Sequence, residues 1–125
     1  MVKKITAVLL ADKIEPCLEF WTKRLGFEKT MEVPGENGLV FAGLKKDNLE
    51  LMYQTYASVE AEEGGHRGFA KGPTFLFVEV QSLDETKKAM EGASIKMAER
   101  KTFYGSREFG VADPAGHLIT FAQFG

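Results

Sequence analysis

The chain contains the same order of predicted elements twice. A strand rich in branched aliphatic residues at 5–11 precedes a helical pattern that begins at Pro16 and ends at Gly26, and three short strand-like runs follow. From residue 74 the order of strand, helix and three strands starts again. Two copies of one supersecondary unit, offset by roughly 70 residues, account for the whole chain. We therefore predict an α+β fold of two tandem βαβββ modules whose sheets form a concave cup.

Turn and capping residues set the boundaries of these elements. Pro16 suits the first turn of a helix, and Ser82 with Glu85 forms a capping box at the start of the second helix. Gly26 suits a left-handed residue that ends the first helix, and Gly92 ends the second. The strands are expected at 5–11, 27–33, 39–44, 49–54, 74–80, 94–99, 106–112 and 117–124, and the second helix at 83–92.

A length of 125 residues fits a single domain. We place module 1 at about 1–53, a linker at about 54–73 and module 2 at about 74–125. The linker is polar and rich in glycine, and a connection of that length usually has a function in a compact domain. It is expected to be either a lid or a simple connection.

Composition narrows the choice of partners and of compartment. The formal net charge is −2 with both signs interspersed, which gives no basic stripe for nucleic acid. No apolar run approaches the roughly 20 residues of a membrane span. Cys17 is the single cysteine and cannot form an intramolecular disulfide, so we expect a cytoplasmic protein in which Cys17 is a buried apolar residue.

Alternation along four strands separates a core face from a cup face, because successive side chains of a strand point to opposite sides of the sheet. The core set packs on the helices, and the cup set lines the concave space. The expected core set is Ile5, Ala7, Leu9, Leu49, Leu51, Leu76, Val78, Val80, Ile119 and Phe121. The expected cup set is Thr6, Val8, Leu10, Glu50, Met52, Phe75, Phe77, Glu79, Thr120 and Ala122.

Three segments carry a resemblance to a known family. FWTKRLGF after the first strand, LELMY in the fourth strand, and YGSREFGVADPAGHLITFAQ near the end resemble the vicinal oxygen chelate superfamily. This superfamily includes glyoxalase I, extradiol dioxygenases, and the fosfomycin and bleomycin resistance proteins. The resemblance covers essentially the full chain and implies the same paired βαβββ fold, with a homodimer as the expected assembly. It leaves function open, because one fold hosts many activities.

The resemblance also implies four positions for metal ligands. Metal-dependent members hold a divalent ion with His or Glu on the cup face of four strands. The corresponding residues here are Thr6, Glu50, Phe75 and Thr120. A catalytic ion needs about three protein ligands with nitrogen or oxygen donors, and phenylalanine supplies none. We expect no metal and no other cofactor, and a divalent ion only if the cup site is unorthodox.

The expected site is therefore an apolar pocket with a few polar groups. Aromatic faces stack on planar ligands, and methionine adapts to irregular ones. Phe75 and Phe77 could equally fill the cup themselves. Glu50 is expected to be solvated, paired with Arg107, or bound to ligand. The candidate ligand-binding residues are Thr6, Val8, Glu50, Met52, Phe75, Phe77, Tyr104, Arg107 and Thr120, with Glu50 as the catalytic candidate.

Tyr104 and Arg107 flank Gly105, which suggests a bulge that directs neighbouring side chains into a site. Arg107 could hold a carboxylate or phosphate of the ligand, or form a structural pair with Glu108 or Glu50. Two histidines are expected outside the site. His117 is predicted to be a solvated turn residue, and His66 an exposed residue of the linker or a lid contact.

Three functions follow from this pattern. The first is a metal-free small-molecule-binding protein similar to the antibiotic-resistance members, which sequesters an apolar or planar aromatic ligand. The second is a lyase or isomerase of the glyoxalase type with Glu50 as general base or sole retained metal ligand. The third is an interaction module whose cup is filled. With no nucleophile beside a base and no intact ligand set, the binding protein is the leading prediction.

Overall fold

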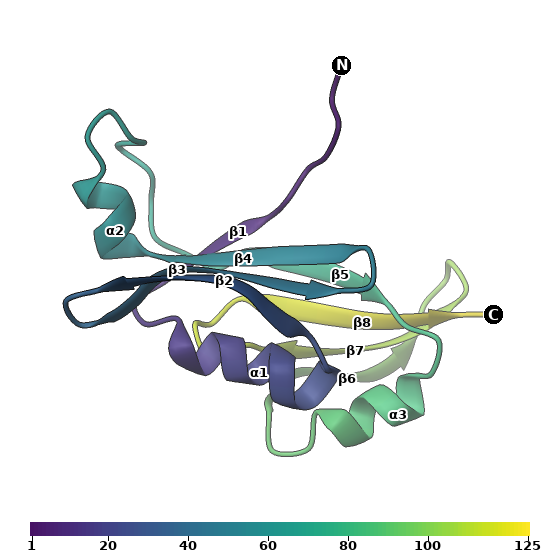
Figure 1. Cartoon of the computed structure of the whole chain (residues 1–125). Helices are drawn as coiled ribbons and strands as arrows, with labels where there is room; N and C mark the ends of the chain where they lie inside the picture. Colours follow the sequence, from purple (N-terminus) through teal and green to yellow (C-terminus); the bar gives the residue numbers. More distant parts are fainter. The chain divides into compact units, whose positions relative to one another are not determined.

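The computed structural model describes all 125 residues and divides the chain into an N-terminal unit, Met1–Lys71, and a C-terminal unit, Gly72–Gly125. Each unit holds one four-stranded sheet with a helix against one face (Figure 1). The two tandem βαβββ modules predicted from the sequence are confirmed, and every predicted strand and helix is present.

The N-terminal sheet has the strand order β1-β4-β3-β2. Strand β1 pairs with β4 in parallel, and the other pairs are antiparallel. Its elements are β1 (Val8–Ala11), α1 (Glu15–Leu25), β2 (Glu28–Gly35), β3 (Gly38–Lys46), β4 (Leu49–Thr55) and α2 (Tyr56–Ala61).

Helix α1 carries the local signals that its sequence predicts. Pro16 lies in its first turn, and Gly26 ends it in the left-handed conformation with φ of 72°. Its buried face includes Cys17 and Trp21, which pack in the core of this unit. The indole N–H of Trp21 donates a hydrogen bond of 2.8 Å to the hydroxyl of Tyr53, so both buried polar atoms are satisfied.

The C-terminal sheet repeats this arrangement with the order β5-β8-β7-β6, and β5 pairs with β8 in parallel. The N-cap Ser82 accepts a hydrogen bond from the N–H of Glu85, as the capping pattern predicts. Ile119 and Phe121 of the central strand are fully buried. The elements of this unit are β5 (Phe75–Glu79), α3 (Leu83–Ala89), β6 (Ser94–Lys101), β7 (Ser106–Ala112) and β8 (Leu118–Phe124).

Some of the expected core residues are exposed. Strand β1 begins at Val8, so Ile5 and Ala7 precede the sheet and Ile5 is 90% exposed. Leu49 is 55% exposed at the first position of β4, whereas Leu51 is buried. These predictions were wrong because alternation states which face a residue takes, but not where the sheet ends.

Helix α2 lies inside the segment at about 54–73 that the sequence predicts to be a linker. Thr55 is its N-cap and accepts a hydrogen bond from the N–H of Ser58 at 3.1 Å. The segment after α2 packs against this helix. Phe69 stacks on Tyr56 with ring centroids 6.4 Å apart, and the Nζ of Lys71 lies 4.7 Å from the centre of the Tyr56 ring. No helix of the chain is long and apolar enough to cross a membrane.

Candidate functional site

One face of the C-terminal sheet, which we call the aromatic face, points away from α3 and holds several of the predicted binding residues. Phe75 and Phe77 lie on it and are 72% and 56% exposed. Thr120 of β8 pairs with Phe77 of β5 and lies on the same face, where its side chain is half-buried. Alternation predicted these three positions correctly, because their neighbours Ile119 and Phe121 are fully buried.

Four rings on this unit form a connected series. The centroid of Phe124 lies 6.3 Å from that of Phe77 and 6.2 Å from that of Tyr104. Phe103 packs edge-on against Tyr104 with centroids 5.1 Å apart. We call these four residues the aromatic cluster. Its members are 42% to 100% exposed, so they present ring surface to solvent.

Tyr104 was predicted from the sequence, but Phe103 and Phe124 were not. Phe124 could have been found by continuing the alternation of β8 from Thr120 by four residues. Phe103 lies in the turn between β6 and β7, where alternation gives no information. Ala122 was expected on the cup face and is fully buried. Ala122 is the cross-strand partner of Glu108, so it lies on the predicted face although neighbouring atoms cover it.

Glu108 is a buried carboxylate on the aromatic face that sequence analysis named only as a pairing partner. Its side chain is fully buried, and it accepts hydrogen bonds from three donors. These are the hydroxyl of Tyr104, the Oγ of Ser106 at 2.9 Å and an Nη of Arg100 at 3.2 Å. Phe109 and Val111 of β7 are core residues, so alternation along this strand could have placed the preceding residue, Glu108, on the opposite face.

The ionisation of Glu108 is decided by two opposing effects. Burial raises the pKa of this carboxyl, but the hydrogen bonds from Tyr104, Ser106 and Arg100 lower it by more, so its pKa lies below the usual value. The carboxylate is therefore ionised at neutral pH, fully hydrogen-bonded and paired with a guanidinium. It holds the Tyr104 phenol in one place beside the other rings.

Arg107 lies on the opposite face of the sheet from the aromatic cluster. Its guanidinium donates to Glu99 at 2.9 and 3.0 Å and to Asp84 of α3 at 3.2 Å. The hydrogen bonds to Glu99 and then Asp84 raise the pKa of Arg107. The expectation that Gly105 directs both Tyr104 and Arg107 into one site fails, because β7 begins at Ser106 and sends odd-numbered residues toward the helix.

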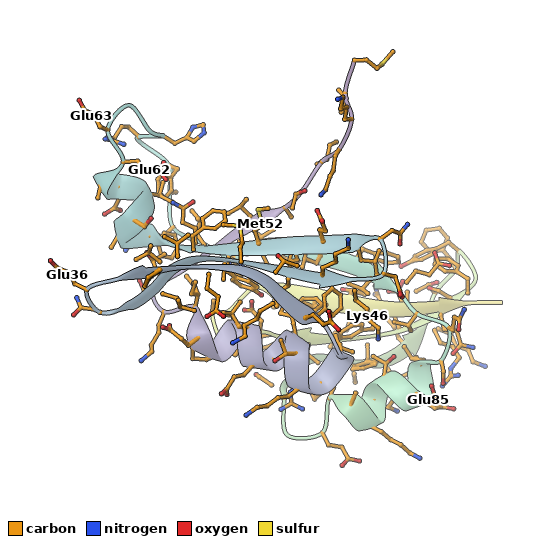
Figure 2. The ribbon with its side chains drawn as sticks, viewed as in Figure 1. Glu36, Lys46, Met52, Glu62, Glu63 and Glu85 are labelled. Carbon is orange, nitrogen blue, oxygen red and sulfur yellow. The ribbon has the colours of Figure 1, made fainter.

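The remaining candidates lie in the N-terminal unit. Val8 is 41% exposed, and Thr6 just before β1 is half-buried. Met52 of β4 is half-buried and lies on the side of the sheet away from α1 (Figure 2). Glu50 forms an ion pair with the ammonium group of Lys4, so its carboxylate is engaged within its own unit.

The four superfamily ligand positions do not fit a divalent ion. Thr6 and Thr120 offer only neutral hydroxyls, Phe75 offers no donor, and Glu50 is bound to Lys4. Within either unit, no three His, Cys, Asp or Glu side chains lie close enough together to hold a metal. Among the four side chains, Glu50 alone carries a donor of the kind that divalent ions prefer.

Neither histidine lies on the aromatic face as a free ligand. His66 is exposed in the segment that follows α2. His117 is 1% exposed, and its Nδ1 accepts a hydrogen bond from the N–H of Thr74. The prediction of a solvated His117 was wrong, because this ring joins the β7–β8 turn to the residue before β5.

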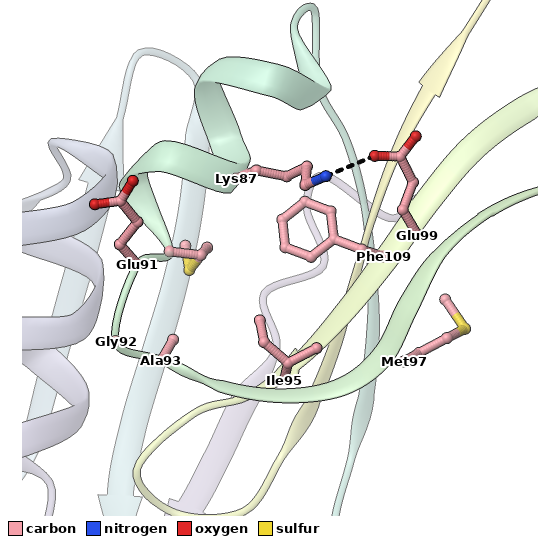
Figure 3. Close-up of a pocket in the computed structure, with 9 residues that line it drawn as sticks. Lys87, Glu91, Gly92, Ala93, Ile95, Met97, Glu99 and Phe109 are labelled. Atoms are coloured by element: carbon pink, nitrogen blue, oxygen red, sulfur yellow. Dashed lines mark hydrogen bonds and ion pairs between the residues drawn. The ribbon is translucent and has the colours of Figure 1, made fainter.

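A separate cavity of about 290 Å³ lies between α3 and strands β6 and β7, outside all predicted site residues (Figure 3). Its apolar lining includes Ile95 and Phe109, and Lys87 pairs with Glu99 at 2.8 Å beside it. The carboxylate of Glu99 also accepts a hydrogen bond from Arg107, so it links α3 and β7 on the helix side of this sheet.

The sequence model of the Glyoxalase/Bleomycin resistance protein/Dioxygenase superfamily matches residues 5–121. The chain belongs to this superfamily. The recognised resemblance to vicinal oxygen chelate proteins is thereby confirmed. A search of curated proteins gives no significant match.

Several solved structures share this fold at low sequence identity. TioX from Micromonospora sp. ML1 has a TM-score of 0.79 and 18% identity, covering 98% of this chain and 99% of TioX. Lactoylglutathione lyase from Agrobacterium tumefaciens has the same TM-score of 0.79 and 18% identity, covering 97% and 92%. The fosfomycin resistance protein FosX from Listeria monocytogenes has a TM-score of 0.72 and 14% identity, covering 100% and 96%. At these identities the likeness shows the fold alone.

Proposed function

We propose that this chain is a metal-free small-molecule-binding protein of the superfamily that takes a planar aromatic ligand on the aromatic face. The observation that carries the proposal is the series of exposed rings formed by Phe77, Phe124 and Tyr104. Such rings bury large apolar area against a planar ligand and add about 0.5–1.5 kcal/mol per ring pair beyond that burial.

The fixed position of Tyr104 supports the same proposal. Its hydroxyl is held by the buried Glu108, so the ring does not have to be ordered when a ligand binds. Pre-ordered contacts raise affinity because less side-chain entropy is lost on binding. FosX, a fosfomycin resistance protein from Listeria monocytogenes, shares the fold, and an antibiotic-like compound is one ligand of the kind proposed here.

The test is equilibrium binding of planar aromatic compounds, such as naphthalene and acridine derivatives, by isothermal titration calorimetry. We expect stoichiometric binding with a Kd that Phe77→Leu raises about three- to tenfold, because one stacking ring is lost. Phe69→Leu, which removes a ring stacked in the N-terminal unit, is the matched control and should leave the Kd unchanged.

Two results would overturn the proposal. One is the absence of binding by any planar compound, which would favour a filled face and an interaction module. The other is a Kd that Phe77→Leu and Phe69→Leu change equally. The metal-free part is tested by repeating the titration in EDTA: an unchanged Kd supports it, and binding that requires added zinc or manganese refutes it.

The assembly and compartment stay predictions. We propose a cytoplasmic homodimer, as the superfamily resemblance implies. Sedimentation equilibrium over a range of protein concentrations tests the assembly. A mass of one chain at every concentration would rule out a homodimer.

A further inference from the structure

Arg100 lies on the aromatic face and was not among the residues expected there. It belongs to β6 and pairs directly with Glu108 of β7 in the antiparallel register. Residues paired in this way project to the same side of the sheet. Glu108 in turn pairs with Ala122 of β8, on the face that also carries Phe77 and Thr120. The guanidinium of Arg100 and the phenol of Tyr104 therefore contact the same carboxylate.

The contact with Glu108 positions the Arg100 side chain but uses little of its donor capacity. Only one Nη of Arg100 contacts the carboxylate, at 3.2 Å, whereas a guanidinium carries five N–H donors. Tyr104 and Ser106 supply the other hydrogen bonds of Glu108. The Arg100 side chain is 56% exposed, so its remaining donors are accessible from solvent.

We propose that Arg100 binds an anionic group of the ligand, so that the ligands of this chain are planar aromatic carboxylates. This inference rests on the proposed function of the aromatic face. A guanidinium matches a carboxylate with two parallel hydrogen bonds, and its planar fork loses less freedom when it is already held. Arg100 contacts Oε1 of Glu108 and Tyr104 contacts Oε2, so the guanidinium and a ring of the aromatic cluster share one carboxylate.

The exposed carboxylate on this face is Glu79, and it would favour a cationic ligand where Arg100 favours an anionic one. Glu79, Ala122, Glu108 and Arg100 form one row across the four strands of the sheet. Glu79 is exposed at the end of β5. An aromatic cation would use Glu79 and the ring faces. Arg100 is favoured because a buried carboxylate already holds it, whereas no contact fixes Glu79.

Three naphthalene probes separate these possibilities: 2-naphthoate, 2-naphthamide and 2-naphthylmethylammonium. They share one ring system and differ in the charge of one substituent. Their dissociation constants are measured by calorimetry for the wild type and for Arg100→Gln, Arg107→Gln and Glu79→Gln. Arg107→Gln is the matched control, since that arginine lies on the helix side of the same sheet.

We expect 2-naphthoate to bind the wild type at least about tenfold more tightly than 2-naphthamide, as a charge-assisted pair allows. Arg100→Gln should reduce that ratio to about one, because it weakens the binding of 2-naphthoate far more than that of 2-naphthamide. Arg107→Gln should preserve the ratio. Thermal melting without ligand identifies any variant that fails to fold. Arg100→Lys, which keeps the charge without the planar fork, should retain only part of the ratio.

The outcomes distinguish this inference from the proposed function. If none of the probes binds, the proposed function fails. If the carboxylate and the amide bind equally, or if Arg100→Gln keeps their ratio, the aromatic face binds ligands but Arg100 does not select them. If the ammonium probe binds most tightly and Glu79→Gln removes that preference, the ligands are aromatic cations and the inference is wrong.

Discussion

The Nδ1 of His117 accepts a hydrogen bond of 2.8 Å from the backbone N–H of Thr74, which lies 43 residues earlier in the chain. The side chain of Asp113 fixes the same turn, because its Oδ1 accepts the N–H groups of His117 at 2.8 Å and Ala115 at 3.0 Å. The N–H of Leu118 also donates to the carbonyl of Thr74 at 3.0 Å. The β7–β8 turn and the start of β5 therefore form one hydrogen-bonded assembly.

His117→Ala should destabilise the protein by about 1–3 kcal/mol, because it leaves the Thr74 N–H without its acceptor and empties a buried volume. His117→Asn should recover part of this loss, since its amide oxygen can accept near the position of Nδ1. Urea denaturation measures both free energies of unfolding. His66→Ala removes the exposed histidine and serves as the control. Equal stabilities of the His117→Ala and His66→Ala variants would contradict the assigned role.

Tyr53→Phe should lower the free energy of unfolding by about 1–3 kcal/mol. The variant removes the acceptor of the Trp21 indole N–H inside the core of the N-terminal unit while it keeps the ring. Tyr56→Phe is the control, because its hydroxyl is not in the core and its ring stays stacked on Phe69. Urea denaturation followed by tryptophan fluorescence reports on both, and a loss for Tyr56→Phe as large as that for Tyr53→Phe would count against the buried hydrogen bond.

The fold could be predicted because its signals are local and occur twice. Gly26 and Ser82 mark helix ends by backbone conformation and side-chain capping, which depend on a few neighbouring residues. Phe77 could be assigned to the aromatic face because the alternation of a strand needs only its own sequence.

The candidate site was harder to predict because it depends on pairing between strands. Glu108 and Arg100 meet only through the β6–β7 register, which contains irregularities between Ile95 and Arg100. Gly105 suggests a bulge that would turn Arg107 into the site, but the regular alternation of β7 places Arg107 on the helix side. Helix α2 was missed because Thr55 ends a strand and caps a helix at the same position.

Tyr104→Phe should lower the free energy of unfolding by about 1–3 kcal/mol, since it removes one of three donors to the buried Glu108 carboxylate. It should also raise the pKa of Glu108, because the hydrogen bond from Tyr104 contributes to lowering it. Phe103→Leu, a change of the neighbouring exposed ring, is the control. Nuclear magnetic resonance titration of the Glu108 side chain gives the pKa. An unchanged value in Tyr104→Phe would refute the hydrogen bond.

We expect the free energy of unfolding to fall at acidic pH because of Glu15. Its Oε2 accepts a hydrogen bond of 2.7 Å from the N–H of Leu39 at the start of β3, and this bond lowers the pKa of Glu15 below the ordinary value of 4.5. A carboxyl whose pKa is lower in the folded state stabilises the protein fully above the pKa of the unfolded chain. That contribution disappears as the pH falls through the folded-state pKa.

Glu15→Gln should therefore cost about 0.5–1.5 kcal/mol at neutral pH, because a neutral amide oxygen accepts the same hydrogen bond more weakly. The difference from the wild type should stay constant down to about pH 5 and then shrink toward pH 3, as the wild-type carboxyl becomes protonated. Urea denaturation at unit steps from pH 7 to pH 3 measures it. Glu19→Gln, at a surface position of α1 paired with Lys23, is the control and should change stability little. A difference between Glu15→Gln and wild type that stays constant down to pH 3 would show that the Leu39 contact does not depend on the charge of Glu15.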